Sequence, residues 1–277
     1  MLRLWGSQLS VALAPDKVVA VQMTRGWRKR VEKKAVWACK PLVSDRYPWE
    51  AAVRAMSAGL ADFKVQGAPT RLVLSNHFVR YVLVPWADQV TGDQERQVMA
   101  RINFETHFGS VSNQWDIRLS PGDYGRATLA SGIDGALPGA LQQACAEAQL
   151  NLISLQPYWM TVVNGYRSKL SAGSLCVVVV ETGRVGLLMA KGGEWYAVRS
   201  LPIRDSLAQD LQPLIRRELL LAGLPTPVRI YLHAPAEPGL TVPSATDFQT
   251  EILGVPTQPG FSPRADAVYG MAMGGAR

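Results

Sequence analysis

Residues 175–203 carry the pattern that most constrains the fold: three short apolar runs separated by two tight turns. The first run, LCVVVV, ends at the turn Glu181-Thr182-Gly183, and the second ends at Gly192-Gly193. Runs rich in β-branched residues between glycine turns are typical of antiparallel strands. The segment therefore predicts a three-stranded meander, with strands at residues 175–180, 185–190 and 195–200.

The N-terminal region repeats this pattern. Three strands are predicted at residues 9–14, 18–23 and 30–38, with Pro15-Asp16 in the first turn and a basic loop in the second. An amphipathic helix is predicted at 44–63, as another is at 207–221 after the later meander. With 277 residues, the chain is long enough for two halves that each bury a core.

The segments between and after the meanders extend the repeat. Two strands at 70–75 and 78–84, a helix beginning near Thr91 and a short strand at 114–119 indicate a small inserted α+β module at about 76–124. Alternating strands and helices then predict parallel pairing beside the first meander. These elements are expected at 126–131, 137–148, 150–155 and 158–170.

The order of elements in the C-terminal part is similar but shorter. Strands are predicted at 228–232 and 248–253, and a last helix begins at Ser262-Pro263. We therefore expect an α/β duplicated fold. Residues 1–170 would form one half with its insertion, residues 171–261 the second half, and residues 262–277 a helix that returns to the first half.

Composition excludes several classes of protein. The longest apolar run is too short to cross a bilayer, and the N-terminal residues lack the apolar core of a signal peptide. The three cysteines are widely spaced, which indicates reduced core thiols and a cytosolic protein. The three histidines have no metal-ligand spacing, and we find no phosphate-binding loop or hydrolase motif.

The net charge of +7 is concentrated in one loop, which holds Arg25, Arg28, Lys29, Arg30, Lys33 and Lys34. A solvated hairpin tip is the simpler explanation, and attraction to an anionic membrane surface or an acidic partner is the alternative. Nucleic acid is disfavoured because Trp27 is the only aromatic residue among these charges.

Four segments resemble the actin-like superfamily (ribonuclease H-like, including FtsA) and, within it, the PilM-type proteins of type IV pilus systems. They are Val82-Leu83-Val84-Pro85 followed by a helix and His107-Phe108-Gly109; residues 127–133 and then Gln149-Leu150-Asn151-Leu152; the hairpins at 175–203; and the terminal segment 265–277. Together they span nearly the whole chain. MshI-type proteins and the cytoplasmic part of GspL are the alternatives within the same resemblance.

The resemblance implies a cytosolic protein at the inner-membrane assembly platform of a pilus or secretion system. PilM-like proteins bind the cytoplasmic tail of a PilN-like membrane partner in a groove beside the inserted module, here near Val84, Pro85 and Trp86. A cytosolic motor ATPase is a further implied partner, and any membrane contact would pass through partners. Trp86 could equally be a core residue of the module.

The resemblance also implies an ATP and magnesium site between the halves. Its remnants would be Asp16, Glu181, Thr182, Gly183 and Gly186. The first turn, Ala14-Pro15-Asp16-Lys17, has no glycine and a proline that cannot donate an N–H to a phosphate. The expected Gly-Gly loop after residue 232 is replaced by His233-Ala234-Pro235.

These departures predict a degenerate site without catalytic residues, and hence a scaffold rather than an enzyme. The alternative is an active ATP-binding protein that gates pilus assembly. A carbohydrate kinase, which shares the fold, would need a general-base aspartate and an intact phosphate loop, and the sequence provides neither.

Overall fold

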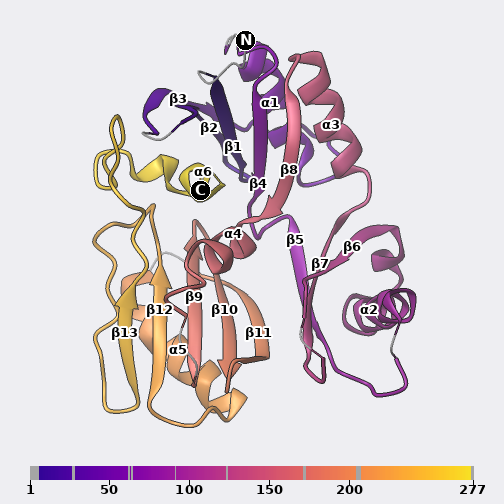
Figure 1. Cartoon of the computed structure of the whole chain (residues 1–277), viewed down its shortest axis with the longest axis vertical. Helices are drawn as coiled ribbons and strands as arrows, with labels where there is room; N and C mark the ends of the chain where they lie inside the picture. The colour runs from indigo at the N-terminus through magenta and orange to yellow at the C-terminus, as the bar shows by residue number, and fades with distance from the viewer. Residues whose placement is uncertain are drawn as a thin grey trace.

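Two five-stranded sheets of the same topology form the framework of the computed structural model, which describes residues 6–26, 29–61, 63, 65–90, 92–122, 124–170, 173–203 and 207–275 (Figure 1). The strand orders are β3-β2-β1-β4-β8 and β11-β10-β9-β12-β13. In each sheet an antiparallel meander is extended by two parallel strands. This confirms the predicted α/β duplicated fold.

The strand bounds agree closely with the sequence pattern. The first sheet contains β1 (Ser7–Leu13), β2 (Lys17–Thr24), β3 (Val31–Ala38), β4 (Pro69–Leu74) and β8 (Asn151–Pro157). The second contains β9 (Leu175–Glu181), β10 (Arg184–Lys191), β11 (Glu194–Pro202), β12 (Val228–His233) and β13 (Phe248–Ile252).

Strand β9 explains why the run of valines is apolar throughout. Val177 and Val179 pack into the core that includes the first sheet, whereas Val178 and Val180 pack into a second core beneath helix α5 (Leu207–Ala222). Successive side chains of a strand point to opposite faces, so a strand buried on both faces has no polar alternation.

The three cysteines are free thiols, and Cys145 and Cys176 are buried.

Four further helices pack on the first sheet. Helices α1 (Glu50–Ala61) and α3 (Leu137–Glu147) pack against each other, α1 also on β2 and β3 and α3 also on β8. Helix α4 (Tyr158–Gly165) contacts β9 as well as β8, and helix α6 (Gly270–Gly275) packs on β1, β2 and β4. The Ser10 hydroxyl donates a hydrogen bond of 2.6 Å to the Ala272 carbonyl, which fixes the end of the chain to β1.

The small module has its own sheet, β5-β7-β6, on which helix α2 lies. Its elements are β5 (Val79–Val84), α2 (Asp93–Phe108), the short 3₁₀ helix η1 (Ser110–Gln114), β6 (Trp115–Leu119) and β7 (Thr128–Asp134). The strand predicted at 126–131 corresponds to β7, but its predicted parallel pairing beside the first meander is wrong. It pairs antiparallel with both β5 and β6, so the module's sheet extends beyond residue 124.

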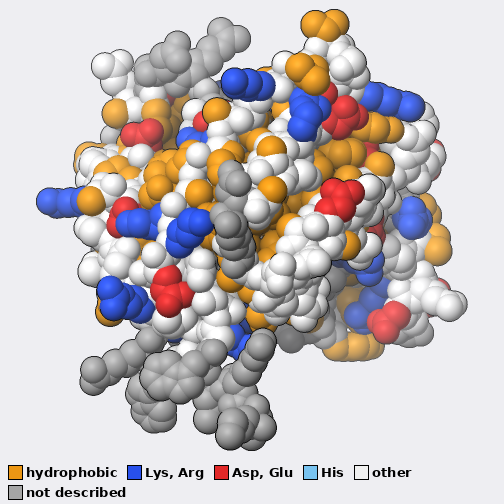
Figure 2. All heavy atoms as spheres, turned by 90° about the horizontal axis from the view of Figure 1, so that it is seen from above, with side chains coloured by type: hydrophobic (Ala, Val, Ile, Leu, Met, Phe, Trp, Pro, Cys, Tyr) orange, Lys and Arg blue, Asp and Glu red, His pale blue; other side chains and the backbone are white. Residues whose placement is uncertain are grey.

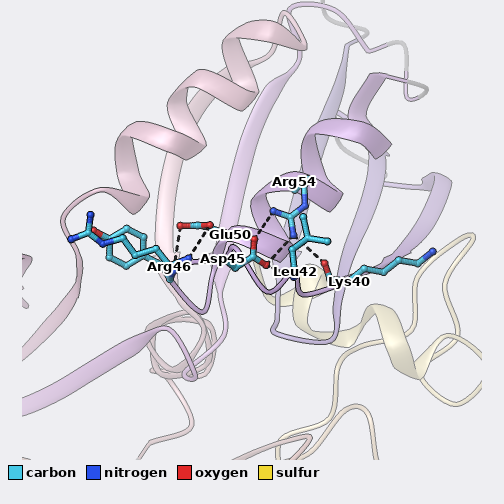
Figure 3. A network of polar contacts seen from close by, with 7 residues as sticks. Lys40, Leu42, Asp45, Arg46, Glu50 and Arg54 are labelled. Atoms are coloured by element: carbon cyan, nitrogen blue, oxygen red, sulfur yellow. Dashed lines mark hydrogen bonds and ion pairs between the residues drawn. The ribbon is translucent and has the colours of Figure 1, made fainter.

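Helix α1 begins later than the predicted residue 44 because the preceding residues form a polar network (Figure 3). Asp45 accepts hydrogen bonds from both Nη atoms of Arg54, at 2.9 and 3.0 Å, and from the backbone N–H of Leu42. The Glu50 carboxylate accepts the N–H groups of Arg46 and Tyr47. A loop satisfied in this way does not need helical hydrogen bonds.

The terminal helix is also shorter than predicted. Residues 262–266 form a turn in which Asp266 accepts the N–H of Ser262 at 2.9 Å and the ammonium group of Lys34 at 2.6 Å. A short 3₁₀ helix, η2 (Ala267–Tyr269), then leads into α6. The division of the chain at about residues 170 and 261 stays a prediction.

The face near the N-terminus mixes apolar and charged side chains (Figure 2). In the part of the chain described above, none of the helices has the length and apolarity needed to span a bilayer.

Candidate functional site

The ends of the two sheets meet at a cleft where the structure brings together residues that are far apart in the sequence. The cleft is lined by the β1–β2 turn, the β9–β10 turn, the loop after β12 and the start of the terminal helical segment. Asp16, Glu181 and Thr182 all line it, and their role in binding a nucleotide stays a prediction. Ser75 and His77 also line it, and no sequence pattern predicted that they would lie there.

Both carboxylate oxygens of Glu181 accept hydrogen bonds from the corner between β4 and β5. The Ser75 hydroxyl donates to Oε2 at 2.5 Å, and the Asn76 side-chain amide donates to Oε1 at 2.6 Å. The Asn76 backbone N–H donates to Oε1 at 3.1 Å. Three donors from the first half therefore hold a carboxylate that belongs to the second sheet, and we call Ser75, Asn76 and Glu181 the latch.

Further contacts hold the latch in place. The Asn76 Oδ1 atom accepts the Tyr81 hydroxyl at 2.6 Å and the Trp159 backbone N–H at 3.3 Å. The Tyr81 and Trp159 rings meet edge to face with centroids 5.0 Å apart. Next to the latch, His77 Nε2 donates to the Thr182 carbonyl at 3.0 Å. The β9–β10 hairpin is thus bound to the first half of the chain through both Glu181 and Thr182.

Burial dominates the electrostatics of this cluster. It raises the pKa of Glu181 above the ordinary value of 4.5, and the hydrogen bonds from Ser75 and Asn76 oppose that rise. Burial lowers the pKa of His77, although its bond to Thr182 acts in the opposite direction. The pKa of Tyr81 is raised well above 10.0, first by burial and then by the Glu181 charge.

Asp16 differs from Glu181 in its surroundings. Its side chain is 49% exposed and forms an ion pair of 3.0 Å with the neighbouring Lys17. In the same turn the Ala14 N–H is already bonded to the Lys17 carbonyl, and Pro15 has no N–H. This turn offers a phosphate few backbone donors.

The two glycines predicted for the site have different positions. Gly183 has a φ of +74° at the β9–β10 turn, where open space surrounds the missing side chain. Gly186 lies within β10 and away from the cleft lining, and a Cβ there would come within 3.3 Å of the Trp159 ring. Close packing against Trp159 therefore accounts for Gly186.

The loop after β12 lines the cleft through Pro235 and Ala236 and packs against the terminal helical segment. Pro235 packs so closely on Gly270 that a Cβ at Gly270 would lie 2.3 Å from the proline ring. His233 is buried, and its Nδ1 donates to the Leu253 carbonyl at 2.6 Å.

The cleft has a volume of about 60 Å³. Pockets for ligands of drug size are usually about 300–1,000 Å³. The cleft between the two sheets is smaller than such a pocket. Among the described residues, no group of three or more His, Cys, Asp and Glu is placed to hold a metal ion.

The residues predicted to bind a partner lie at the end of β5. Val84 is buried against α2, Pro85 is exposed, and Trp86 is half-buried. The Trp86 indole packs edge-on against Tyr124 with centroids 4.6 Å apart, and its N–H donates to Asp88 at 2.8 Å. The Arg96 guanidinium lies 4.8 Å from the Trp86 ring centroid. Val84, Pro85 and Trp86 line one shallow hollow of the module.

A larger hollow lies on the other side of Pro85, between the module and the β10–β11 hairpin. Its volume is about 430 Å³, and Leu83, Pro85, Trp195 and Tyr196 form its apolar lining. Tyr196 is 51% exposed. Glu194 and Ala127 also line the hollow, and the Glu194 carboxylate accepts the Ala127 N–H at 3.0 Å. The sequence analysis did not predict that residues 194–196 line this hollow, because nothing in their sequence marks them as neighbours of the module.

Comparison with solved structures identifies the fold as that of the actin-like ATPases, as the sequence resemblance predicted. The chain is similar to the structure of a PilM–PilN type IV pilus biogenesis complex, with a TM-score of 0.62, 13% identity and 97% of each chain covered. It is also similar to the cytoplasmic domain of EpsL, an inner-membrane component of the type II secretion system of Vibrio cholerae, with a TM-score of 0.58, 11% identity and 90% of each chain covered. A Bacteroides thetaiotaomicron protein of unknown function with an actin-like ATPase fold has a TM-score of 0.55 at 7% identity over 82% of each chain. No protein-family model matches the sequence, and no curated protein matches it either.

Proposed function

We propose that this protein is a cytosolic scaffold of the inner-membrane assembly platform of a type IV pilus or a related secretion system. It binds the cytoplasmic tail of a PilN-like membrane protein and does not hydrolyse ATP. The observation that carries the proposal is the latch, which uses Glu181 to join the two halves where an ATPase would hold magnesium.

The similarity to the PilM–PilN complex over 97% of both chains supports a PilN-like partner. The narrow cleft, the proline in the first turn and the Pro235–Gly270 packing support a degenerate nucleotide site. The scaffold would lie between the membrane partner and a cytosolic motor ATPase, peripheral to the inner membrane.

The tail would dock around Pro85. A short extended peptide would place apolar side chains in the hollow lined by Tyr196 and contact Trp86 on the other side of the proline. Aromatic side chains at the centre of an interface are the usual source of binding energy.

The test is a calorimetric titration with a synthetic peptide of the PilN-like tail from the same genome. The proposal predicts a complex with a Kd of about 1 μM or tighter. Tyr196→Ala and Trp86→Ala should each weaken it about tenfold or more, since hot-spot residues are worth more than 1 kcal/mol. Leu220→Ala, at an even more exposed apolar residue of α5, is the control and should bind normally.

The alternative, a nucleotide-gated assembly protein, is separated by repeating the titration with Mg·ATP. The scaffold predicts the same Kd with and without nucleotide. A change in Kd with Mg·ATP would favour gating, and the absence of any tail complex would refute the docking role.

A further inference from the structure

The loop between β2 and β3 concentrates positive charge at one end of the molecule. Of the 29 Lys and Arg residues, six fall within residues 24–34, where Glu32 is the only acid. Arg25, Lys29, Arg30 and Lys33 are exposed, whereas Trp27 and Arg28 lie outside the described residues.

Backbone and side-chain hydrogen bonds connect the two ends of the loop. The Arg30 N–H donates to Thr24 Oγ1 at 2.9 Å, and the Arg30 carbonyl accepts the Thr24 N–H at 2.9 Å. The Arg25 N–H donates to the Gly6 carbonyl at 2.7 Å. These bonds join the two ends of the loop to each other and to the residue that precedes β1.

The acids of this region are engaged elsewhere. Glu32 accepts hydrogen bonds from Ser7 at 2.9 Å and Gln22 at 3.2 Å, and Asp266 pairs with Lys34. Across the described residues, the structure records no ion pair for Arg25 or Arg30. Other surface arginines do have carboxylates nearby, as in the pairs Arg54–Asp45, Arg118–Asp116 and Arg216–Asp247.

The position of the loop suits a broad, flat anionic partner. The eight residues of β2 separate it from the β1–β2 turn at the cleft, a distance of roughly 25 Å at the rise of a strand. A surface that contacts the loop would thus leave the cleft and the module accessible. A nucleic-acid interface usually needs a basic stripe that follows the phosphate backbone, and a single hairpin tip is too small for that.

We propose that the exposed basic residues at the two ends of the β2–β3 loop, Arg25, Lys29 and Arg30, together with Lys33 on β3, bind directly to the anionic headgroups of a phospholipid bilayer. This lipid contact is additional to the proposed link through the membrane partner and does not depend on it. The attraction is electrostatic, so it weakens as salt screens the charges. Each basic residue near such a surface strengthens binding about fivefold.

The test is co-sedimentation of the purified chain, without any partner, with phosphatidylcholine vesicles that contain or lack phosphatidylglycerol. We expect binding only to the anionic vesicles, and loss of binding at high salt. The double variant Arg25→Glu/Arg30→Glu should lower the partition coefficient about tenfold or more.

The matched control is Arg101→Glu/Arg167→Glu, which changes the net charge equally at exposed residues far from the loop in sequence. It should stay within about twofold of the unmodified protein, because screening limits charge effects to about 10 Å. Equal losses in the two double variants, equal binding to neutral vesicles or no binding at all would each overturn the proposal. Tighter binding to duplex DNA than to anionic vesicles at the same salt, lost in the loop variant, would also overturn it. Because the tail peptide is absent, none of these results bears on tail docking.

Discussion

Glu181, the last residue of β9, accepts a hydrogen bond of 2.6 Å from the Asn76 side chain, although 105 residues separate the two in the sequence. This contact joins the second sheet to the corner that follows β4. An acidic residue that the resemblance assigns to magnesium therefore contributes here to the junction of the two halves.

Replacing Glu181 with Gln should destabilise the protein. Glutamine would present an amide group to three donors, and at least one of those donors would lose its acceptor. We expect a loss of about 1 to 3 kcal/mol in the free energy of unfolding, measured by urea denaturation. Glu105→Gln, at an exposed site on α2, should change it by less than about 0.5 kcal/mol. An unaltered stability for Glu181→Gln would contradict the latch.

The loss of stability caused by Glu181→Gln should depend on pH. Burial raises the pKa of Glu181 above 4.5. Between pH 4.5 and this raised pKa, the folded protein therefore binds more protons than the unfolded chain does. The contribution of Glu181 to stability is therefore largest below pH 4.5 and falls as the pH rises. Since Gln does not titrate, the stability difference between the two proteins should narrow with rising pH in a series of urea titrations. A difference that widens would indicate a lowered pKa, as for a carboxylate paired with a cation.

Asp16→Asn should have almost no effect on folding. Asp16 is half-exposed and pairs only with adjacent Lys17 among the described contacts of its carboxylate, and surface ion pairs contribute little. We expect a change below about 0.5 kcal/mol in the same urea experiment. A loss as large as that of Glu181→Gln would mean that both acids hold the halves together.

Gly186→Ala should destabilise the protein by about 1 to 3 kcal/mol, because the added methyl group would press on the Trp159 ring at 3.3 Å. Gly183→Asn is the comparison, since asparagine tolerates the positive φ and open space surrounds this residue. Thermal unfolding should show a clear fall for the first variant and a small one for the second. The reverse order would refute the packing role of Gly186.

Local sequence patterns predicted most of the fold. The β-branched runs and glycine turns at residues 175–203 define a meander whatever surrounds them, and β9, β10 and β11 lie where that pattern places them. Pairing partners are not encoded locally, which is why β7 was expected in the wrong sheet. The start of α1 was missed because the Asp45–Arg54 contact spans nine residues and satisfies the loop before it.

The site was less predictable. Its acidic residues could be named because each lies in a recognisable hairpin turn, and the structure does bring Asp16, Glu181 and Thr182 to one cleft. Their partners, Ser75 and Asn76, are common turn residues in a segment remote from both hairpins. Only the packing of the two halves shows that these residues use the Glu181 carboxylate.

The most direct test of the central claim is thermal unfolding of the purified protein with and without Mg·ATP. A protein with a working site would be stabilised by about 2.7 kcal/mol at a nucleotide concentration one hundred times Kd. The latch account predicts that the unfolding temperature does not change at millimolar Mg·ATP. A concentration-dependent increase that disappears in Asp16→Asn would contradict it.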